Sequence, residues 1–319
     1  MYNQIMIETV VKHAGAVADV RPVDAGSFKI KPYTWFMAET PTVSELSILS
    51  KKLHLDLGDL GDVLDPNESP RLDHDSRHGY LYVRYPHVGE DSSITTQPLL
   101  IIYGAENLVT VFSTRPNFLN KLLSAKSDFS TDSSQSIMLK LLEQISLSYD
   151  ISIKGQSDLI KKIISKMHAH KLENEDFVGF VLIEDEINSF LSALTPMVPL
   201  LHRVATSRHL SLDDRERDTL EDITLAIEQA INICNANSKR IISIREAYAT
   251  LSNNSLNRTM RALTAATLLI AFPNVVFGMY GMNVSLPIQH DSWAFAVIIF
   301  STLAVVITII AIARRKHWF

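Results

Sequence analysis

The stretch that decides the fold is Leu212–Asn283, and its residues are LDDRERDTLEDITLAIEQAINICNANSKRIISIREAYATLSNNSLNRTMRALTAATLLIAFPNVVFGMYGMN. Neither proline nor glycine occurs between Pro199 and Pro273, and a run without these breakers indicates a single helix. Ser211 followed by Asp214 predicts a capping box at its start. At about 1.5 Å per residue, the helix is on the order of 100 Å long. Because its last third is apolar, we expect a stalk that runs from a soluble domain into a membrane.

A heptad seam follows the first part of this helix. Mostly apolar residues, with Asn237 as the polar exception, recur every seven positions in two series: Leu220, Ile227, Cys234, Ile241 and Tyr248, and three positions on, Ile223, Ala230, Asn237, Ile244 and Leu251. This a/d pattern predicts a helix that packs against other helices.

A second stripe of polar and small residues begins further toward the C-terminus of the same helix. Its members alternate three and four positions apart and share one face: Glu246, Thr250, Asn253, Asn257, Met260, Thr264, Thr267, Ala271, Asn274 and Gly278. One interpretation is close helix packing, with threonines bonded to their own backbone. The other is a water-filled path, lined by this face in several copies around an axis. Asn274 favours the second, because an unpaired amide deep in a bilayer is costly.

Composition excludes several classes of protein. The chain has 319 residues, a formal net charge of −5 and one cysteine. The slight negative charge and the lack of a basic patch with interleaved aromatics argue against nucleic-acid binding. No intrachain disulfide is possible, and Cys234 is expected to be packed and inert. The first ten residues do not resemble a signal peptide.

The chain divides into seven predicted segments. They are a cytoplasmic α/β domain at 1–116, a helical domain at 117–210, the stalk at 211–259, a first transmembrane helix at 260–282, an external loop at 283–292, a second transmembrane helix at 293–313 and a basic tail at 314–319. The fold class is therefore α+β. Because basic residues flank both spans and none lies in the loop, both termini are expected in the cytoplasm.

Local patterns predict the elements of the soluble part. Strands are expected at Ser27–Tyr33, Thr34–Ala38, Gly79–Tyr85, Leu99–Tyr103 and Leu108–Phe112. Helices are expected at Thr42–Leu53, Leu57–Leu64, Asn117–Ser127, Ser133–His170 and Glu173–Leu194, the last followed by an interruption at Thr195–Pro199 and a further piece to Arg208. The long helices are expected to form antiparallel pairs alongside the stalk.

The sequence offers little for catalysis. Asp73-His74-Asp75 and His168-Ala169-His170 are the clusters nearest to a metalloenzyme site, and neither has three ligands. No P-loop, glycine fingerprint or nucleophile elbow occurs. We therefore do not expect an enzyme.

The outer end of the first span carries Gly278-Met279-Tyr280-Gly281-Met282-Asn283. In this position, and with this order of segments, the chain resembles the CorA family of magnesium channels and transporters over essentially its whole length. The resemblance implies a homopentamer whose pore mouth, at Gly281, Met282 and Asn283, holds a hydrated cation. It also implies a location in the plasma (inner) membrane, with the lipid bilayer, the other copies and a divalent metal ion as partners.

The resemblance also assigns the pore. It implies a hydrophobic gate at Met260 and Leu263, a polar position at Asn274 and the cytoplasmic pore end at Asn257. The stripe adds Thr264, Thr267, Ala271 and Gly278 to the lining. Mg²⁺ is then both the transported and the regulatory ion, with Co²⁺ or Ni²⁺ as further cargo. The regulatory metal site of the family, which bridges neighbouring subunits, falls on Asp62 and Asp222.

Two alternatives stay open. The external loop has one acid, Asp291, where the family has an acidic segment, and His290 keeps a zinc transporter of the same architecture in view. The other alternative is a membrane-anchored scaffold in which the stalk is only a coiled coil.

Overall fold

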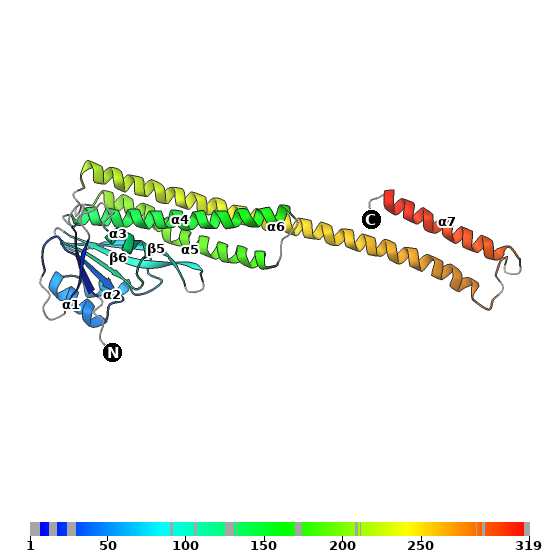
Figure 1. Ribbon diagram of the computed structural model, residues 1–319, viewed down its shortest axis with the longest axis horizontal. Helices are drawn as coiled ribbons and strands as arrows, with labels where there is room; N and C mark the ends of the chain where they lie inside the picture. The colour runs from blue at the N-terminus through cyan, green and yellow to red at the C-terminus, as the bar shows by residue number, and fades with distance from the viewer. Residues whose placement is uncertain are drawn as a thin grey trace. The chain divides into compact units, whose positions relative to one another are not determined.

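The computed structural model describes residues 7–12, 18–23, 30–89, 92–104, 107–124, 131, 133–169, 174–207, 210, 212–284, 286–288 and 291–315. The chain forms two compact units, Met1–Ile241 and Ile242–Phe319. The first holds a sheet with covering helices, and the second holds two apolar helices (Figure 1). The α+β class and the long helix that continues into the apolar region are thus confirmed.

A seven-stranded mixed sheet organises the first unit. Its strands are β1 (Ile7–Val11), β2 (Asp19–Pro22), β3 (Trp35–Glu39), β4 (Arg71–His74), β5 (Gly79–Val88), β6 (Ile94–Tyr103) and β7 (Leu108–Phe112). They lie in the order β2-β1-β3-β7-β6-β5-β4. The pair β3 and β7 is parallel, and the other neighbours are antiparallel. The central strands are buried on both faces, which explains their nearly continuous apolar sequence.

The strand predictions succeeded at the centre of the sheet and failed at its edges. Four predicted strands correspond to β3, β5, β6 and β7. The edge strands β1, β2 and β4 were not predicted. A strand expected at Ser27–Tyr33 lies partly outside the described residues, and its described part is not a strand. There Tyr33 has a φ of 61°, a left-handed conformation that ends an extended run after Pro32.

Helices cover both faces of the sheet. They are α1 (Val43–Leu53), α2 (Leu57–Asp62), α3 (Asn117–Leu123), α4 (Ser134–His168), α5 (Asn174–Ala205), α6 (Asp214–Tyr280) and α7 (Ala294–Arg315). Residues of α1 and α2, among them Leu46, Leu49 and Leu60, share a core with Phe36 and Tyr82 of the sheet. The long helices α4 and α5 lie on the opposite face (Figure 1). The predicted capping box of α1 is present at Thr42 and Glu45.

The predicted interruption of α5 is wrong. Pro196 and Pro199 lie inside a continuous helix. Each proline removes a backbone donor and costs the helix stability. Next to them, however, Leu194, Met197 and Leu200 are buried, so packing against the sheet outweighs that cost.

An ion pair of 2.6 Å between Lys166 and Asp176 joins the end of α4 to the start of α5.

The start of α6 also differs from the prediction. The capping box is made by Asp213 and Glu216: the Glu216 N–H donates to Asp213 Oδ1 (2.7 Å), and the Asp213 N–H donates to Glu216 Oε2 (3.1 Å). Ser211 lies outside the described residues. Asp213 is a favourable N-cap because its carboxylate accepts a hydrogen bond from the first turn of the helix. Its negative charge also interacts favourably with the positive end of the helix dipole.

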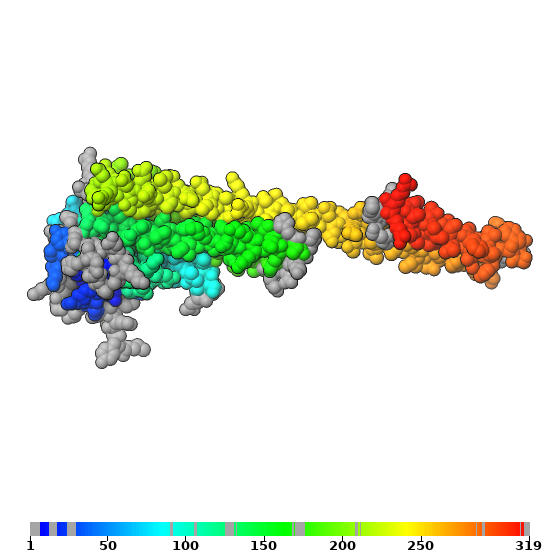
Figure 2. Space-filling model, turned by 45° about the horizontal axis from the view of Figure 1, so that its top comes forward, coloured from blue at the N-terminus to red at the C-terminus, as the bar shows by residue number. Residues whose placement is uncertain are grey.

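The heptad seam of α6 is buried over the part that belongs to the first unit. All its members from Leu220 to Ile241 are at most 7% exposed, whereas Leu251 further on is 48% exposed. The buried amide of Asn237 donates to Ser157 Oγ of α4 at 2.8 Å. In the space-filling view α4 and this part of α6 lie against each other along their length (Figure 2). The seam prediction is confirmed for this part of the helix.

Burial makes Cys234 a testable marker of the seam. Its side chain has no exposed surface, and burial raises the pKa of its thiol to about 12. Compared with an ordinary cysteine, roughly a thousandfold less thiolate is present at a given neutral pH. We expect no alkylation of the folded protein by iodoacetamide at pH 8, and complete alkylation in denaturant, as measured by mass spectrometry. Stoichiometric labelling of the folded protein, absent from a Cys234→Ala control, would contradict the buried seam.

Candidate functional site

Two helices that reach into the second unit are long and apolar enough to cross a membrane. They are α7 and the last part of α6, and these two segments lie side by side (Figure 1). Only 6% of the most apolar stretch of each helix is buried. Most of their apolar surface is therefore left for other partners, which is what a bilayer or further copies of the chain supply.

The face of α6 that meets α7 consists mainly of small and apolar residues. Ala265 is 1% exposed, and the residues on the same face are half-buried: Ala262, Ala266, Leu269, Phe272, Pro273, Val276 and Tyr280. On α7, Ala294 and Thr302 are buried. Among the described residues of the second unit, only these two helices and part of their connection are present, so the two helices cover each other.

The polar stripe lies on the opposite side of α6. Its members Met260, Thr264, Thr267, Ala271, Asn274 and Gly278 are all exposed, as are Asn257 and Leu263. Each of the first six precedes a half-buried residue of the α7 face by two positions. Two positions correspond to about 200° around a helix. The stripe is thus turned away from α7, a relation that the sequence alone does not define.

The threonines of the stripe have a defined hydrogen-bond polarity. Thr264 Oγ1 donates to Met260 O (2.8 Å), and Thr267 Oγ1 donates to Leu263 O (2.9 Å). The single hydroxyl proton of each is used on its own helix, as in the packing interpretation. The oxygen lone pairs remain available as acceptors on the exposed face. Such acceptors suit the protons of water molecules around a cation.

The Gly281-Met282-Asn283 segment directly follows the end of α6. The Gly281 N–H donates to Phe277 O (3.0 Å), and the Met282 N–H donates to Met279 O (3.2 Å). A Cβ on Gly281 would lie 3.3 Å from Phe277 O, a tight contact that favours glycine. All three residues are exposed. A helix C-terminus carries partial negative charge and carbonyls without helical partners, which is favourable for a cation.

The connection between α6 and α7 is described only in part. His290 lies outside the described residues. Asp291 is exposed, and its backbone initiates α7, since the Ala294 N–H donates to Asp291 O at 3.1 Å.

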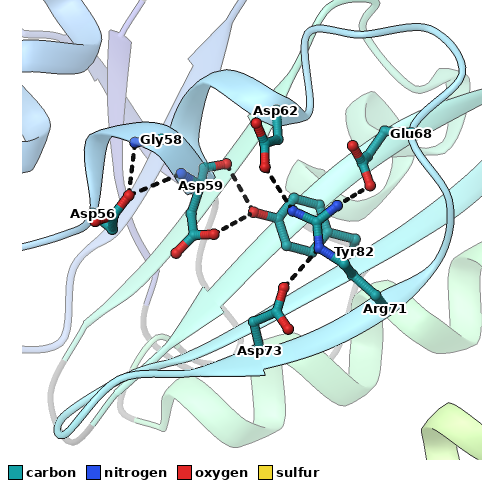
Figure 3. A network of polar contacts seen from close by, with 8 residues as sticks. All are labelled: Asp56, Gly58, Asp59, Asp62, Glu68, Arg71, Asp73 and Tyr82. Carbon is teal, nitrogen blue, oxygen red and sulfur yellow. Dashed lines mark hydrogen bonds and ion pairs between the residues drawn. The ribbon is translucent and has the colours of Figure 1, made fainter.

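The two predicted regulatory aspartates lie in the first unit, and no described contact joins them. Asp222 is exposed on α6 beside the buried Ile223. Asp62 is the last residue of α2, and its carboxylate forms an ion pair of 2.8 Å with Arg71. Figure 3 shows Arg71 among several carboxylates. Among the described residues, no group of three or more His, Cys, Asp or Glu side chains could hold a metal ion.

The clusters with a weak resemblance to metal sites have structural roles where they are described. Asp73 binds Arg71 Nε at 2.6 Å. Asp75 accepts hydrogen bonds from the N–H groups of Arg77 and His78, both at 2.6 Å, and from Tyr80 Oη at 2.8 Å. Burial opposes the charge of Asp75, yet these bonds lower its pKa to about 2. His170 lies outside the described residues.

Arg71 is the residue of this region that the sequence patterns missed. It opens the short strand β4, which was not predicted, and its partners come from α2, the following loop and β4. No periodicity marks such a residue, because its importance depends on chain segments that meet only in the fold.

Comparisons with known proteins place the chain in a family. The model of the CorA-like Mg²⁺ transporter protein family matches residues 31–315. The cobalt/magnesium transport protein CorA of Methanocaldococcus jannaschii is 26% identical over 320 residues, which cover 97% of this chain and 99% of that protein.

Solved structures agree at the level of the fold. The complete CorA magnesium transporter from Methanocaldococcus jannaschii gives a TM-score of 0.85 at 23% identity and covers 99% of each chain. The full-length CmaX protein gives 0.79 at 14% identity, with 98% of this chain and 100% of that chain covered. The cytoplasmic domain of ZntB from Vibrio parahaemolyticus gives 0.63 at 12% identity, with 78% and 99% covered.

The family model covers most of the chain, including the first unit and both apolar helices. The two candidate spans at the C-terminal end fit a membrane protein. The chain belongs to the CorA-like Mg²⁺ transporter family, whose members carry divalent cations across membranes and are not known enzymes.

Proposed function

We propose that the chain forms a homopentameric channel that passes hydrated Mg²⁺ through a pore lined by the polar stripe of α6. The observation that carries the proposal is that this stripe faces away from α7 and leads to Gly281-Met282-Asn283 at the helix end. Asn257, Thr264, Thr267, Ala271, Asn274 and Gly278 line the path. Gly281, Met282 and Asn283 form the outer mouth.

Exposed apolar residues on both sides of the stripe support a ring of copies. Leu268 and Val275 lie on one flank, and Ile270 and Phe277 lie on the other; each is at least half exposed. At about 100° per residue, the two flanks lie some 70–100° from the centre of the stripe. A copy of the same helix packed on each flank would cover this surface and enclose the stripe. The number five comes from the family resemblance.

The chemistry of the stripe suits a strongly hydrated ion. Mg²⁺ gives up its water molecules reluctantly. Threonine oxygens, the Asn274 and Asn283 amides and the carbonyls at the helix end are neutral acceptors that bind those waters without holding the ion tightly. Co²⁺ and Ni²⁺ are further candidate ions, because they too carry a shell of water. Met260 and Leu263, which are 53% and 61% exposed, provide an apolar constriction that gates by dewetting.

Charge around the spans supports an orientation. Arg258 and Arg261 lie at the base of the first span, and Arg314 and Arg315 end α7. The segment between the spans contains neither lysine nor arginine. We therefore place both termini in the cytoplasm and the protein in the plasma (inner) membrane.

The first unit holds the residues proposed for regulation. We propose that cytoplasmic Mg²⁺ binds between Asp62 of one copy and Asp222 of its neighbour and holds the closed state. Both carboxylates are exposed, so they are accessible to an ion. A divalent ion between them removes the repulsion of like charges across an interface.

The two alternatives predict different observations. A zinc transporter would favour soft or imidazole ligands, and the stripe contains no cysteine or histidine. A scaffold would show no ion flux at all. Flux of Mg²⁺, Co²⁺, Ni²⁺ and Zn²⁺ into liposomes that contain the purified protein separates all three.

The mouth provides the first test. We expect wild-type liposomes to take up Mg²⁺ and Asn283→Ala liposomes to take it up at least about tenfold more slowly, because each hydrogen bond to the hydrated cation contributes about 1.5 kcal/mol. Uptake is followed with a Mg²⁺-sensitive dye, and assembly by size-exclusion chromatography with light scattering. The neighbouring Val284→Ala serves as the matched control and should behave as wild type. Unchanged uptake by an assembled Asn283→Ala protein would contradict the proposal that Asn283 belongs to the pore mouth.

Asn274 tests the lining. Asn274→Ser keeps a hydrogen-bond acceptor and should retain most of the flux, whereas Asn274→Leu should lower flux about tenfold through loss of one water-binding group per copy. Flux and oligomeric state are measured on the same preparation. A Leu variant that fails to assemble, with the Ser variant normal in both respects, would show that Asn274 packs between helices instead.

Topology is tested by labelling intact cells with a membrane-impermeant maleimide. We expect Val284→Cys to react from outside and a cysteine appended to the C-terminus to react only after lysis. Cys234 is replaced by alanine in both proteins to remove background. The opposite labelling pattern would reverse the orientation.

A further inference from the structure

One cationic side chain already occupies the carboxylate of Asp62. All three nitrogens of the Arg71 guanidinium are engaged by separate carboxylates (Figure 3). Nη2 lies 2.8 Å from Asp62 Oδ2, Nε lies 2.6 Å from Asp73 Oδ2, and Nη1 contacts Glu68 Oε1. Charge-assisted bonds of this kind are among the stronger ones in proteins.

The guanidinium also lies over the ring of Tyr82. Its Cζ lies 3.8 Å from the centroid of the Tyr82 ring, a cation–π contact. Tyr82 is 1% exposed in the sheet, and its hydroxyl donates to Asp59 O at 2.9 Å. Partial burial disfavours the charge of Arg71, but the bonds to Asp73 and Asp62 raise its pKa. Arg71 is therefore a charged group in a defined position.

The cluster is open to ions from solution. The side chains of Asp62 and Asp73 are 51% and 48% exposed, whereas that of Arg71 is 31% exposed. Three carboxylates around one guanidinium leave an excess of negative charge. A divalent cation that approaches Asp62 must therefore share or displace the Arg71 contact.

We infer that Arg71 is an intramolecular competitor for the Asp62 carboxylate and sets the Mg²⁺ concentration at which that carboxylate binds the ion. The inference rests on the proposed function, in which Asp62 belongs to the regulatory site. Arg71 is a positioning residue: it acts through Asp62 and does not touch the transported ion.

Removal of the competitor should strengthen metal binding. An ion pair of this exposure contributes up to about 1 kcal/mol, so Arg71→Gln should lower the half-saturating Mg²⁺ concentration by about fivefold. Arg71→Lys keeps a positive charge and should stay near wild type. A variant that merely misfolded would lose the response to Mg²⁺ and would not shift it to lower concentration.

Arg115 offers a matched control. Its side chain is 30% exposed and is held by two carboxylates, Glu39 at 2.8 Å and Glu8 at 3.4 Å. Arg115→Gln removes a guanidinium of equal exposure from the same unit without touching Asp62. It should leave the Mg²⁺ response unchanged.

The experiment uses the full chain in detergent and two readouts over a metal titration. Limited proteolysis gives the Mg²⁺ concentration for half-protection, and electron paramagnetic resonance gives binding of Mn²⁺ as a probe. We expect Arg71→Gln to shift both midpoints down, Arg71→Gln/Asp62→Asn to cancel the shift, and Asp62→Ala/Asp222→Ala to lose protection. Equal midpoints for Arg71→Gln and wild type would overturn the inference.

The two readouts separate this inference from the regulatory proposal. If Mg²⁺ does not protect the wild type, regulation through Asp62 and Asp222 fails, and Mn²⁺ binding alone decides about Arg71. Tighter, Asp62-dependent Mn²⁺ binding in Arg71→Gln would then support the competition. Unchanged Mn²⁺ binding in that variant would reject it.

Discussion

The buried seam of α6 is the interaction on which the first unit depends. A helix gains little stability from its backbone alone, so most of it must come from burial of one face. Over Leu220–Ile241 that face packs against the helices that cover the sheet, and the Asn237 amide is satisfied by Ser157. The seam also decides which residues of α6 stay in water. Asp222 is exposed because its neighbour Ile223 occupies the buried position.

Beyond the seam, the same helix obeys a different constraint. In a bilayer every backbone group must be satisfied within the segment, which a continuous helix achieves. The hydrophobic effect no longer drives helix packing there, and helices instead associate through small residues that allow close approach. Ala262, Ala265 and Ala266 meet α7 in this way. The exposed residues of α6 are then divided between a polar stripe and two apolar flanks, and this division supports the proposal of a ring of copies.

Charge is handled differently at the two candidate sites. The proposed mouth and stripe offer neutral acceptors, which suit an ion that must leave as readily as it enters. The region around Asp62 instead concentrates carboxylates and places Arg71 among them. An arginine cannot lose its charge near neutral pH. Its influence on Asp62 therefore does not vary with pH in the physiological range.

Sequence by itself determined the long helix, the seam, the polar stripe, the central strands and the Gly281-Met282-Asn283 segment, because each depends on local periodicity or on residues adjacent in the chain. The residues proposed for the stripe and the mouth, which are most of the candidate site, could be named from the sequence for this reason. Edge strands such as β4 and the continuity of α5 through Pro196 and Pro199 were decided by the fold. The fold also decided that the stripe lies on the side of α6 turned away from α7, and that Asp62 forms an ion pair with Arg71. These features depend on contacts between distant segments, whose packing energies exceed the local preferences that a sequence pattern expresses.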